Sequence, residues 1–378
     1  MDIRISRSIE ELGSGSLTEL DGGLDFSYGL LRAIERSLWG RLEVRYLTVE
    51  DGDGPVAFTP VYLGSNLNFN ALLPRFVQSS YAAMVAGLGV GFGYSIAVVG
   101  SLISDRGWIP THRRLTDRAA ALRLLLVAVD ELARSAGCDL CLLKDIHEEY
   151  PAEERGLMRR SGFSEGYSLP TIHINTRHGS FEEYLQRHLT KNGRKHARKQ
   201  FRKAEGRYEL RAVEDFAPLV PRVYPLLRAT FLRARYQFEE LPPRFFSECS
   251  GSEHPRTEMI LCEQDGAVAG ALLVFYDAHQ QLNKRIGIDY RRSDSGLIYN
   301  LLNYEGIRRA IERGISTLLL GQSSYLPKTR MGGELTDQYL LIKGYRPLLR
   351  VSLPVQNLWM RRYRAARVLA EVERGESP

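Results

Sequence analysis

The alternation of apolar and polar positions along the chain predicts the same order of elements twice. Two β-rich runs are each interrupted by Asp-Gly, at residues 53–54 and 265–266, and both residue types tolerate the positive φ of a tight hairpin turn. Apolar residues then recur at spacings of three and four over residues 115–136 and 297–313, as on one face of a helix. Each helix ends at a glycine and runs into an apolar strand. This repetition predicts two mixed α/β domains in tandem.

A third landmark closes each copy, because Gly162 and Gly344 are both followed by an aromatic residue and then by a strand pattern. The first copy also contains a glycine-rich insertion within residues 76–104, which carries no charge. It is long enough to span a bilayer, but its glycines favour a loop leading into a strand, so no membrane span is expected. The expected fold class is α/β with mixed sheets, divided into residues 1–172, residues 173–357 and a basic helical tail at 358–378.

The composition is that of an ordinary folded protein, with 44% hydrophobic and 25% charged residues among 378. Residues 187–207 carry nine Lys or Arg against the single Glu205, which is more than the whole net charge of +6. Four cysteines form no disulfide framework and the N-terminus lacks a signal peptide's apolar region, which predicts a reducing, cytoplasmic location. Neither Cys138 and Cys141 nor the scattered histidines form a metal-binding pattern, so no metal is expected.

The basic segment is predicted to be a helix with two cationic faces. Like charges this dense destabilise a helix unless solvent or an anion neutralises them. The segment is therefore a candidate docking surface for an anionic donor or carrier, and a solvated surface helix is the alternative. Its candidate docking residues are Lys191, Arg194, Arg198 and Arg202 on one face and Lys195 and Lys199 on the next.

Two segments carry a resemblance to a known family. They read SFEEYLQRHLTKNGRKHARKQFRKAEGRYEL, from residue 180, and GQSSYLPKTRMGGELTDQYLLIKG, from residue 321. With the order of elements, they resemble the Fem-type aminoacyltransferases of peptidoglycan bridge synthesis and the broader Fem-like group of GNAT acyltransferases. The resemblance covers residues 170–350 and implies two tandem GNAT-like domains, the second opened by the basic helix. It also implies an enzyme that transfers an acyl or aminoacyl group to a small-molecule amine acceptor, with aminoacyl-tRNA as one source of the group.

One turn departs from the pattern of GNAT enzymes that use acyl-CoA. Their turn before the central helix reads Gln/Arg-x-x-Gly-x-Gly/Ala, whose backbone N–H groups and helix dipole hold a pyrophosphate. Here Arg291 and Gly296 match, but Asp294 stands where the first glycine is expected, and a carboxylate repels a pyrophosphate. Acyl-CoA is therefore disfavoured and no cofactor is expected. The donor is then aminoacyl-tRNA, an acidic carrier protein, or no acyl donor at all.

The strand predicted at residues 280–289 offers candidate chemistry. With a period of two, Asn283, Arg285 and Asp289 share one face, and such a polar face in an interior strand favours a wet cleft. Asp289 is the candidate general base, and Asn283 and Arg285 are candidate substrate anchors. The alternative for Asp289 is a structural salt bridge with Arg285 or Arg291.

The loop after the next strand contains Tyr325 and Lys328. The Lys328 cation is a candidate to stabilise an oxyanion, and Tyr325 is a candidate proton donor, because the Lys-then-Gly pattern belongs to the resemblance. Tyr299, on the central helix, is a candidate to reach the substrate, although tyrosines in such helices more often pack the core.

Two rival functions remain open at this stage. In the first, a natural-product biosynthetic enzyme on this scaffold acts on a substrate tethered to an acidic carrier protein, with chemistry such as ring closure. In the second, the scaffold is inactive and the chain binds RNA through the basic helix. Phe201 is the one aromatic residue among the basic residues, which argues against stacking on RNA bases.

Overall fold

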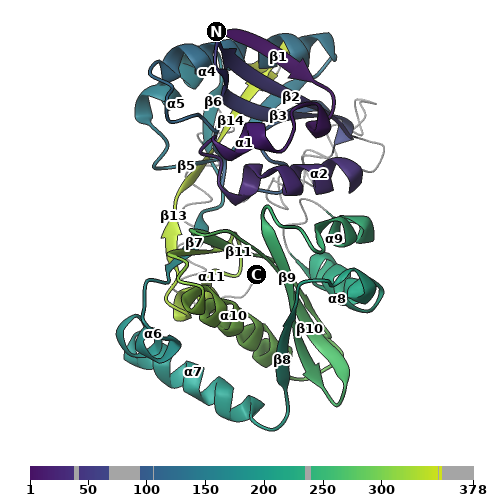
Figure 1. Cartoon of the computed structure of the whole chain (residues 1–378), viewed down its shortest axis with the longest axis vertical. Coiled ribbons are helices and arrows are strands. Elements are labelled where there is room, and N and C mark those ends of the chain that lie inside the picture. The colour runs from purple at the N-terminus through teal and green to yellow at the C-terminus, as the bar shows by residue number, and fades with distance from the viewer. Residues whose placement is uncertain (38–41, 68–93, 105, 235–239, 348, 351–378) are drawn as a thin grey trace. The chain divides into compact units, whose positions relative to one another are not determined.

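The computed structural model describes residues 1–37, 42–67, 94–104, 106–234, 240–347 and 349–350 (Figure 1). Within these ranges the chain divides into two compact units. The first unit consists of residues 1–168 and of the segment that starts at Asp337, and the second consists of residues 169–234 and 240–336. Most of the predicted glycine-rich insertion and all of the predicted tail lie outside the described residues. No described helix combines the length and the apolar character needed to cross a membrane.

The first unit is built on one mixed sheet. Its helices are α1 (Gly15–Thr18), α2 (Tyr28–Ser37), α4 (Arg118–Ser135) and α5 (Ala152–Arg160), with 3-10 turns at Ile9–Glu11 and Leu24–Phe26. The apolar side chains of α4 pack against β2 and β3 and complete a buried core. In spatial order the strands are β1 (Asp2–Ser6), β2 (Leu42–Asp51), β3 (Gly54–Leu67), β4 (Tyr94–Val99), β5 (Leu140–His147), β14 (Gln338–Gly344) and β6 (Ser164–Tyr167).

The second unit repeats this order of elements. Its strands, in spatial order, are β13 (Glu334–Thr336), β7 (Thr171–Asn175), β12 (Thr317–Gly321), β11 (Gln280–Ile288), β10 (Ala267–Tyr276), β9 (Arg256–Gln264) and β8 (Glu209–Val213). Its helices are α6 (Phe181–Arg187), α7 (Lys191–Ala204), α8 (Val220–Arg233), α9 (Pro243–Cys249), α10 (Ser295–Glu312) and α11 (Tyr325–Arg330), with a 3-10 turn at Ala217–Leu219. Both predicted hairpins are present, as β2–β3 and β9–β10. The predicted α/β class with two mixed sheets is confirmed.

Each sheet contains one strand that directly follows the other unit in the sequence. The last described strand, β14, lies between β5 and β6 of the first sheet, and its Leu341 pairs with Leu143 and with Glu165. Conversely β7, which directly follows the first unit, lies between β12 and β13 of the second sheet. The expected second domain, 173–357, included β14, which the pairing places in the first sheet. An apolar strand pattern suits either sheet, and only the hydrogen-bond partners distinguish them.

The predicted equivalence of Gly162 and Gly344 is wrong. Gly162 follows α5 and precedes β6, and its structural counterpart is Gly332, which follows α11 and precedes β13. Both have the positive φ that favours glycine after a helix, 91° and 81°. Gly344 instead ends β14.

Candidate active site

The two central parallel strands of the second sheet separate partway along their length. β11 and β12 pair only from Gln280 with Thr317 to Leu282 with Leu319, although β11 continues to Ile288. Beyond that point the described residues supply no strand on this side of β11. A strand edge without a neighbour presents backbone N–H and C=O groups to whatever lies beside it. We call this region the β11–β12 opening.

A β-bulge lies where the two strands separate. On β10, Leu273 pairs with Arg285 and the following residue, Val274, pairs with Asn283, so Lys284 is the extra residue. Bulges bend a strand and shift the faces to which its later side chains point. The bulge therefore helps to turn the outer part of β11 away from β12.

The bulge overturns the predicted polar face of β11. Asn283 lies against α10, because a Cβ on Gly306 of that helix would be 2.5 Å from the Asn283 Nδ2 atom. Gly287 lies against α8 instead, since its own Cβ would be 2.6 Å from the backbone nitrogen of Leu227. Asn283 is 7% exposed and accepts a hydrogen bond from Gln281 at 3.1 Å. It packs the sheet against the helix, whereas Arg285 is half-buried at the bulge.

A substitution at Gly287 tests this packing. We expect Gly287→Ala to lower the free energy of unfolding by about 2 kcal/mol, because helix backbone cannot move aside as a flexible side chain can. The matched control is Gly296→Ala, since a Cβ at Gly296 meets no atom within 4 Å. Urea denaturation of both variants measures the difference, and equal stabilities would contradict the close approach of α8 to β11.

Asp289, directly after β11, is held by arginines. Its carboxylate accepts from the Arg291 guanidinium at 2.8 and 3.0 Å and lies 3.5 Å from the Arg292 Nε atom. The hydrogen bond from Arg291 holds the pKa of this carboxyl below its usual value, although partial burial opposes the shift. A carboxylate with a lowered pKa is a weak general base. This geometry favours the salt-bridge alternative for Asp289.

Asp294 precedes α10 and also has cationic neighbours. Its carboxylate accepts from the Tyr208 hydroxyl at 2.7 Å and from Arg207 at 2.8 Å, and these bonds, that of Tyr208 first, lower its pKa. The side chain makes no hydrogen bond to the first turn of α10. With Arg291 and Arg292, the turn therefore has three guanidinium groups near two carboxylates. The repulsion of a phosphate that the sequence predicted from Asp294 is offset by Arg207.

Tyr299 lies at the β11–β12 opening. Its hydroxyl makes hydrogen bonds with the Ser324 and Asn303 side chains, and the Tyr290 hydroxyl is nearby. Tyr290 follows β11 and Ser324 follows β12, so Tyr299 on α10 reaches the ends of both separating strands. Burial raises the pKa of the Tyr299 phenol, which keeps it protonated at neutral pH. Ser323 and Ser324 both have positive φ, 65° and 51°, an uncommon conformation for residues other than glycine.

Lys328 and Tyr325 support the turn that carries Ser324. The Lys328 ammonium donates to the carbonyl oxygens of Gln322 at 3.0 Å and Gly321 at 3.4 Å, and the residue is 6% exposed. The Tyr325 hydroxyl donates to the Pro170 carbonyl at 3.0 Å. Both side chains thus bind backbone carbonyls around the turn, which stabilises its backbone. The sequence pattern predicted a loop for these two residues, but both lie in α11, directly after the turn.

α10 is anchored to the sheet by a buried carboxylate. Glu258 on β9 is fully buried and accepts from Arg309 at 2.8 and 2.6 Å and from Arg313 at 2.6 Å. Burial raises its pKa, but the hydrogen bonds from both arginines outweigh burial and hold the pKa below its usual value. The sequence alone gave no sign of this role, because a lone Glu in a strand pattern carries no local signal.

In the first unit β4 and β5 separate in the same way, but another segment of the chain lies between them. β4 and β5 pair up to Val99 and Leu143. The segment of residues 107–112 then takes the place of β4: Gly107 bridges to Ile146, and His112 donates its backbone N–H to Val56 at 2.8 Å. Among the described residues of the first unit, this segment leaves a cavity of about 10 Å³ beside the separated strands, lined in part by Val99, Gly107 and Leu143.

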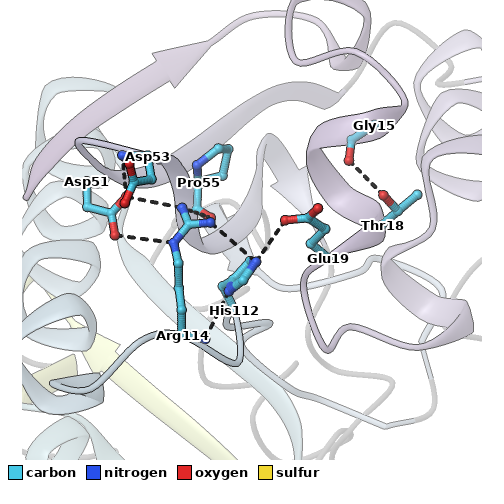
Figure 2. Close-up of polar contacts among 8 residues, drawn as sticks. All are labelled: Gly15, Thr18, Glu19, Asp51, Asp53, Pro55, His112 and Arg114. Carbon is cyan, nitrogen blue, oxygen red and sulfur yellow. Dashed lines mark hydrogen bonds and ion pairs between the residues drawn. The ribbon is translucent and has the colours of Figure 1, made fainter.

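A polar network fixes the end of this filling segment (Figure 2). Arg114 donates to the two carboxylate oxygens of Asp51 at 3.1 and 3.4 Å. His112 accepts the backbone N–H of Arg114 through Nδ1 and lies 2.9 Å from the Glu19 carboxylate through Nε2. Glu19, directly after α1, and Asp51, at the end of β2, thus bind His112 and Arg114 and hold the end of the segment in place.

The basic helix α7 lies along α10 in the second unit (Figure 1). Phe201 packs on Tyr304 of α10 with ring centroids 5.2 Å apart. Arg194 donates to the Gln186 carbonyl at 2.5 Å, and Arg198 pairs with Glu182 at 2.9 Å, so these two cations hold α6. The remaining cations of the helix are exposed and have no ion-pair partner among the described residues: Lys191, Lys195, Lys199, Arg202 and Lys203.

The described residues contain no group of three or more His, Cys, Asp or Glu side chains placed to hold a metal ion. All four cysteines are buried and unpaired with one another.

Comparisons with known proteins agree with this geometry. Residues 191–327 match the sequence model of the acetyltransferase (GNAT) domain. The fold is similar to that of FemX, with a TM-score of 0.61 and 10% identity, covering 93% of this chain and 99% of that one. It is also similar to L-PGS from Bacillus licheniformis, with a TM-score of 0.55 and 12% identity, covering 94% and 97%. Residues 191–327 thus resemble a GNAT acetyltransferase domain in sequence, and the fold of the chain is similar to that of the Fem-like protein FemX.

A curated relative extends the comparison. The putative 8-amino-7-oxononanoate synthase 2 of Mycobacterium tuberculosis is 25% identical over 225 residues, which is 58% of this chain. The matched region is 29% of the length of that relative. Together with the family match, the comparisons support an acyltransferase in general terms.

Proposed function

We propose that the second unit transfers an acyl or aminoacyl group from an anionic carrier to a small-molecule amine, at the β11–β12 opening. The observation that carries the proposal is the separation of β11 from β12 beside a cationic turn. An extended donor arm can pair with the exposed edge of β11 as an added strand does. Its phosphate then lies near Arg291, Arg292 and the first turn of α10, whose N–H groups the Asp294 side chain does not use.

The reaction needs no covalent enzyme intermediate. The amine nitrogen forms a bond to the acyl carbon, and the bond from that carbon to the carrier's sulfur or oxygen breaks. The nitrogen loses a proton to solvent, and the leaving atom gains one. Tyr299 is the described hydroxyl best placed to supply that proton, because it is protonated at neutral pH and lies where both strands end. In this proposal Asp289 acts as a positioning residue for the turn.

The donor is a substrate, and the proposal requires no resident cofactor. Aminoacyl-tRNA, an acyl group on an acidic carrier protein and acyl-CoA all present a phosphate to the turn. Incubating the full chain with each donor and a panel of amines, followed by mass spectrometry for a new amide, tests the function. If none of the three donors gives an amide, the proposed function is wrong.

The role of the turn is tested with Arg291→Gln. We expect the KM for an acyl-CoA or carrier-borne donor to rise about tenfold, because a charge-assisted contact to phosphate is lost. The KM for the same acyl group on pantetheine, which lacks the phosphate, should be unchanged. Arg123→Gln, an exposed arginine on α4, is the matched control. An equal rise for both donors would mean that the substitution merely loosens the turn.

A further inference from the structure

The exposed cations of α7 form a stripe that is one helix wide. Lys191, Lys195, Lys199 and Lys203 follow one another at spacings of four, and Arg202 lies beside the last. Between Lys191 and Lys203 an α-helix rises about 18 Å. Like charges at spacings of four destabilise a helix by a few tenths of a kcal/mol per pair, so the stripe does not serve the stability of α7.

Carboxylates border the stripe. Glu182 and Glu183 line the neighbouring α6, and Glu205 and Glu209 follow the C-terminal end of α7. Many other exposed arginines of the second unit are already paired, as Arg207, Arg211, Arg228 and Arg244 are. Among the described residues, α7 therefore carries five exposed cations without an ion pair, whereas Arg177, Arg222 and Arg330, which are also exposed and without an ion pair, lie on separate segments.

The dimensions and chemistry of the stripe favour one kind of partner. A structured nucleic acid spreads its phosphates over two strands and would meet the bordering carboxylates. Single-stranded RNA uses aromatic side chains for stacking, but Phe201 is turned inward against Phe181 and Tyr304. An acidic helix with carboxylates at spacings of four matches both the width and the spacing of the lysines.

The stripe ends at the turn that the proposed function assigns to the donor's phosphate. Arg207 and Tyr208, just beyond α7, bind Asp294 at the start of α10. A partner lying along α7 thus has one end beside that turn. Resting on the proposed function, we propose that α7 docks the acidic helix of a carrier protein whose phosphopantetheine arm delivers the acyl group to the β11–β12 opening.

Charge reversal on the stripe tests the docking directly. The variant Lys195→Glu/Lys199→Glu changes two exposed side chains to another good helix former, so folding should be retained. The control, Arg123→Glu/Arg160→Glu, makes the same charge change on exposed positions of α4 and α5. The probe is a small acidic acyl carrier protein bearing an acetylated phosphopantetheine, labelled for fluorescence anisotropy at low salt.

We expect the stripe variant to weaken carrier binding at least about tenfold, the control to bind as the unchanged protein does, and added salt to weaken the binding. Equal weakening in both variants, or none in either, overturns the docking proposal. It is also overturned if unlabelled tRNA displaces the carrier, binds more tightly than the carrier does, and loses its binding in the stripe variant. If the carrier binds at α7 but no amide forms from any donor, the docking stands and the proposed acyl transfer fails.

Discussion

Replacing Tyr299 with phenylalanine is expected to lower kcat for amide formation about a hundredfold, with little change in the KM of the donor. The reason is that general acid catalysis contributes about 10²- to 10⁴-fold, and the substitution removes only the hydroxyl, which makes hydrogen bonds with Ser324 and Asn303. The measurement is steady-state kinetics with whichever donor gives product, alongside thermal unfolding to show that the variant is folded.

Two comparisons separate proton donation from a merely structural role. Tyr304→Phe removes another hydroxyl of α10, one that is buried without a hydrogen-bond partner among the described residues, and should leave kcat unchanged. With a series of thioesters whose thiols are increasingly acidic, the defect of Tyr299→Phe should shrink, because a better leaving group needs less protonation. A constant defect across the series would show that Tyr299 acts by packing or orientation.

Replacing Glu258 with glutamine is expected to lower the free energy of unfolding by about 3 kcal/mol, since it leaves Arg309 and Arg313 without their buried counter-charge. Activity should fall as well, because these arginines anchor α10, which carries Tyr299. Urea denaturation measures the loss as a lower midpoint with an unchanged slope. The control is Glu263→Gln on the same strand, whose partner Arg211 is half-exposed, and we expect at most about 1 kcal/mol there.

The effect of Glu258 should depend on pH with a definite sign. Its folded-state pKa is lower than the ordinary value of 4.5, so its contribution to stability is fully present above that value. The contribution is lost as the pH falls through the folded-state pKa. The stability difference between the protein and Glu258→Gln should therefore shrink in acid. A difference independent of pH would contradict the role of the ionised carboxylate.

The candidate site was only partly predictable, and β11 shows why. A strict period of two placed Asn283 and Asp289 on one face, but the bulge at Lys284 inserts one residue and sends Asn283 against α10. No local pattern marks a bulge, because it depends on how the neighbouring strand is bent. Tyr299 was singled out from the sequence as a candidate to reach the substrate, and its contacts with Ser324 and Tyr290 depend on how α10 packs on the sheet.

The basic helix was also predictable only in part. Its charge, its ends and its amphipathic character can be predicted from the sequence, and α7 spans Lys191–Ala204 as the pattern indicates. Which cations face solvent depends on α6, because Arg194 and Arg198 make contacts with Gln186 and Glu182 there. Those two arginines were included in the candidate docking surface, and the contacts leave the lysines as its main exposed charges.

By itself the sequence determined the duplicated order of elements, the two Asp-Gly hairpins, the mixed α/β class and the basic helix, because each depends on residues close together in the chain. Tertiary structure alone decided three things: the exchange of β7 and β14, the opening between β11 and β12, and the filling of its counterpart by residues 107–112. All three are choices of hydrogen-bond partner between segments far apart in sequence. The pattern of apolar residues in a strand predicts that it joins a sheet, but it does not determine which strand it pairs with.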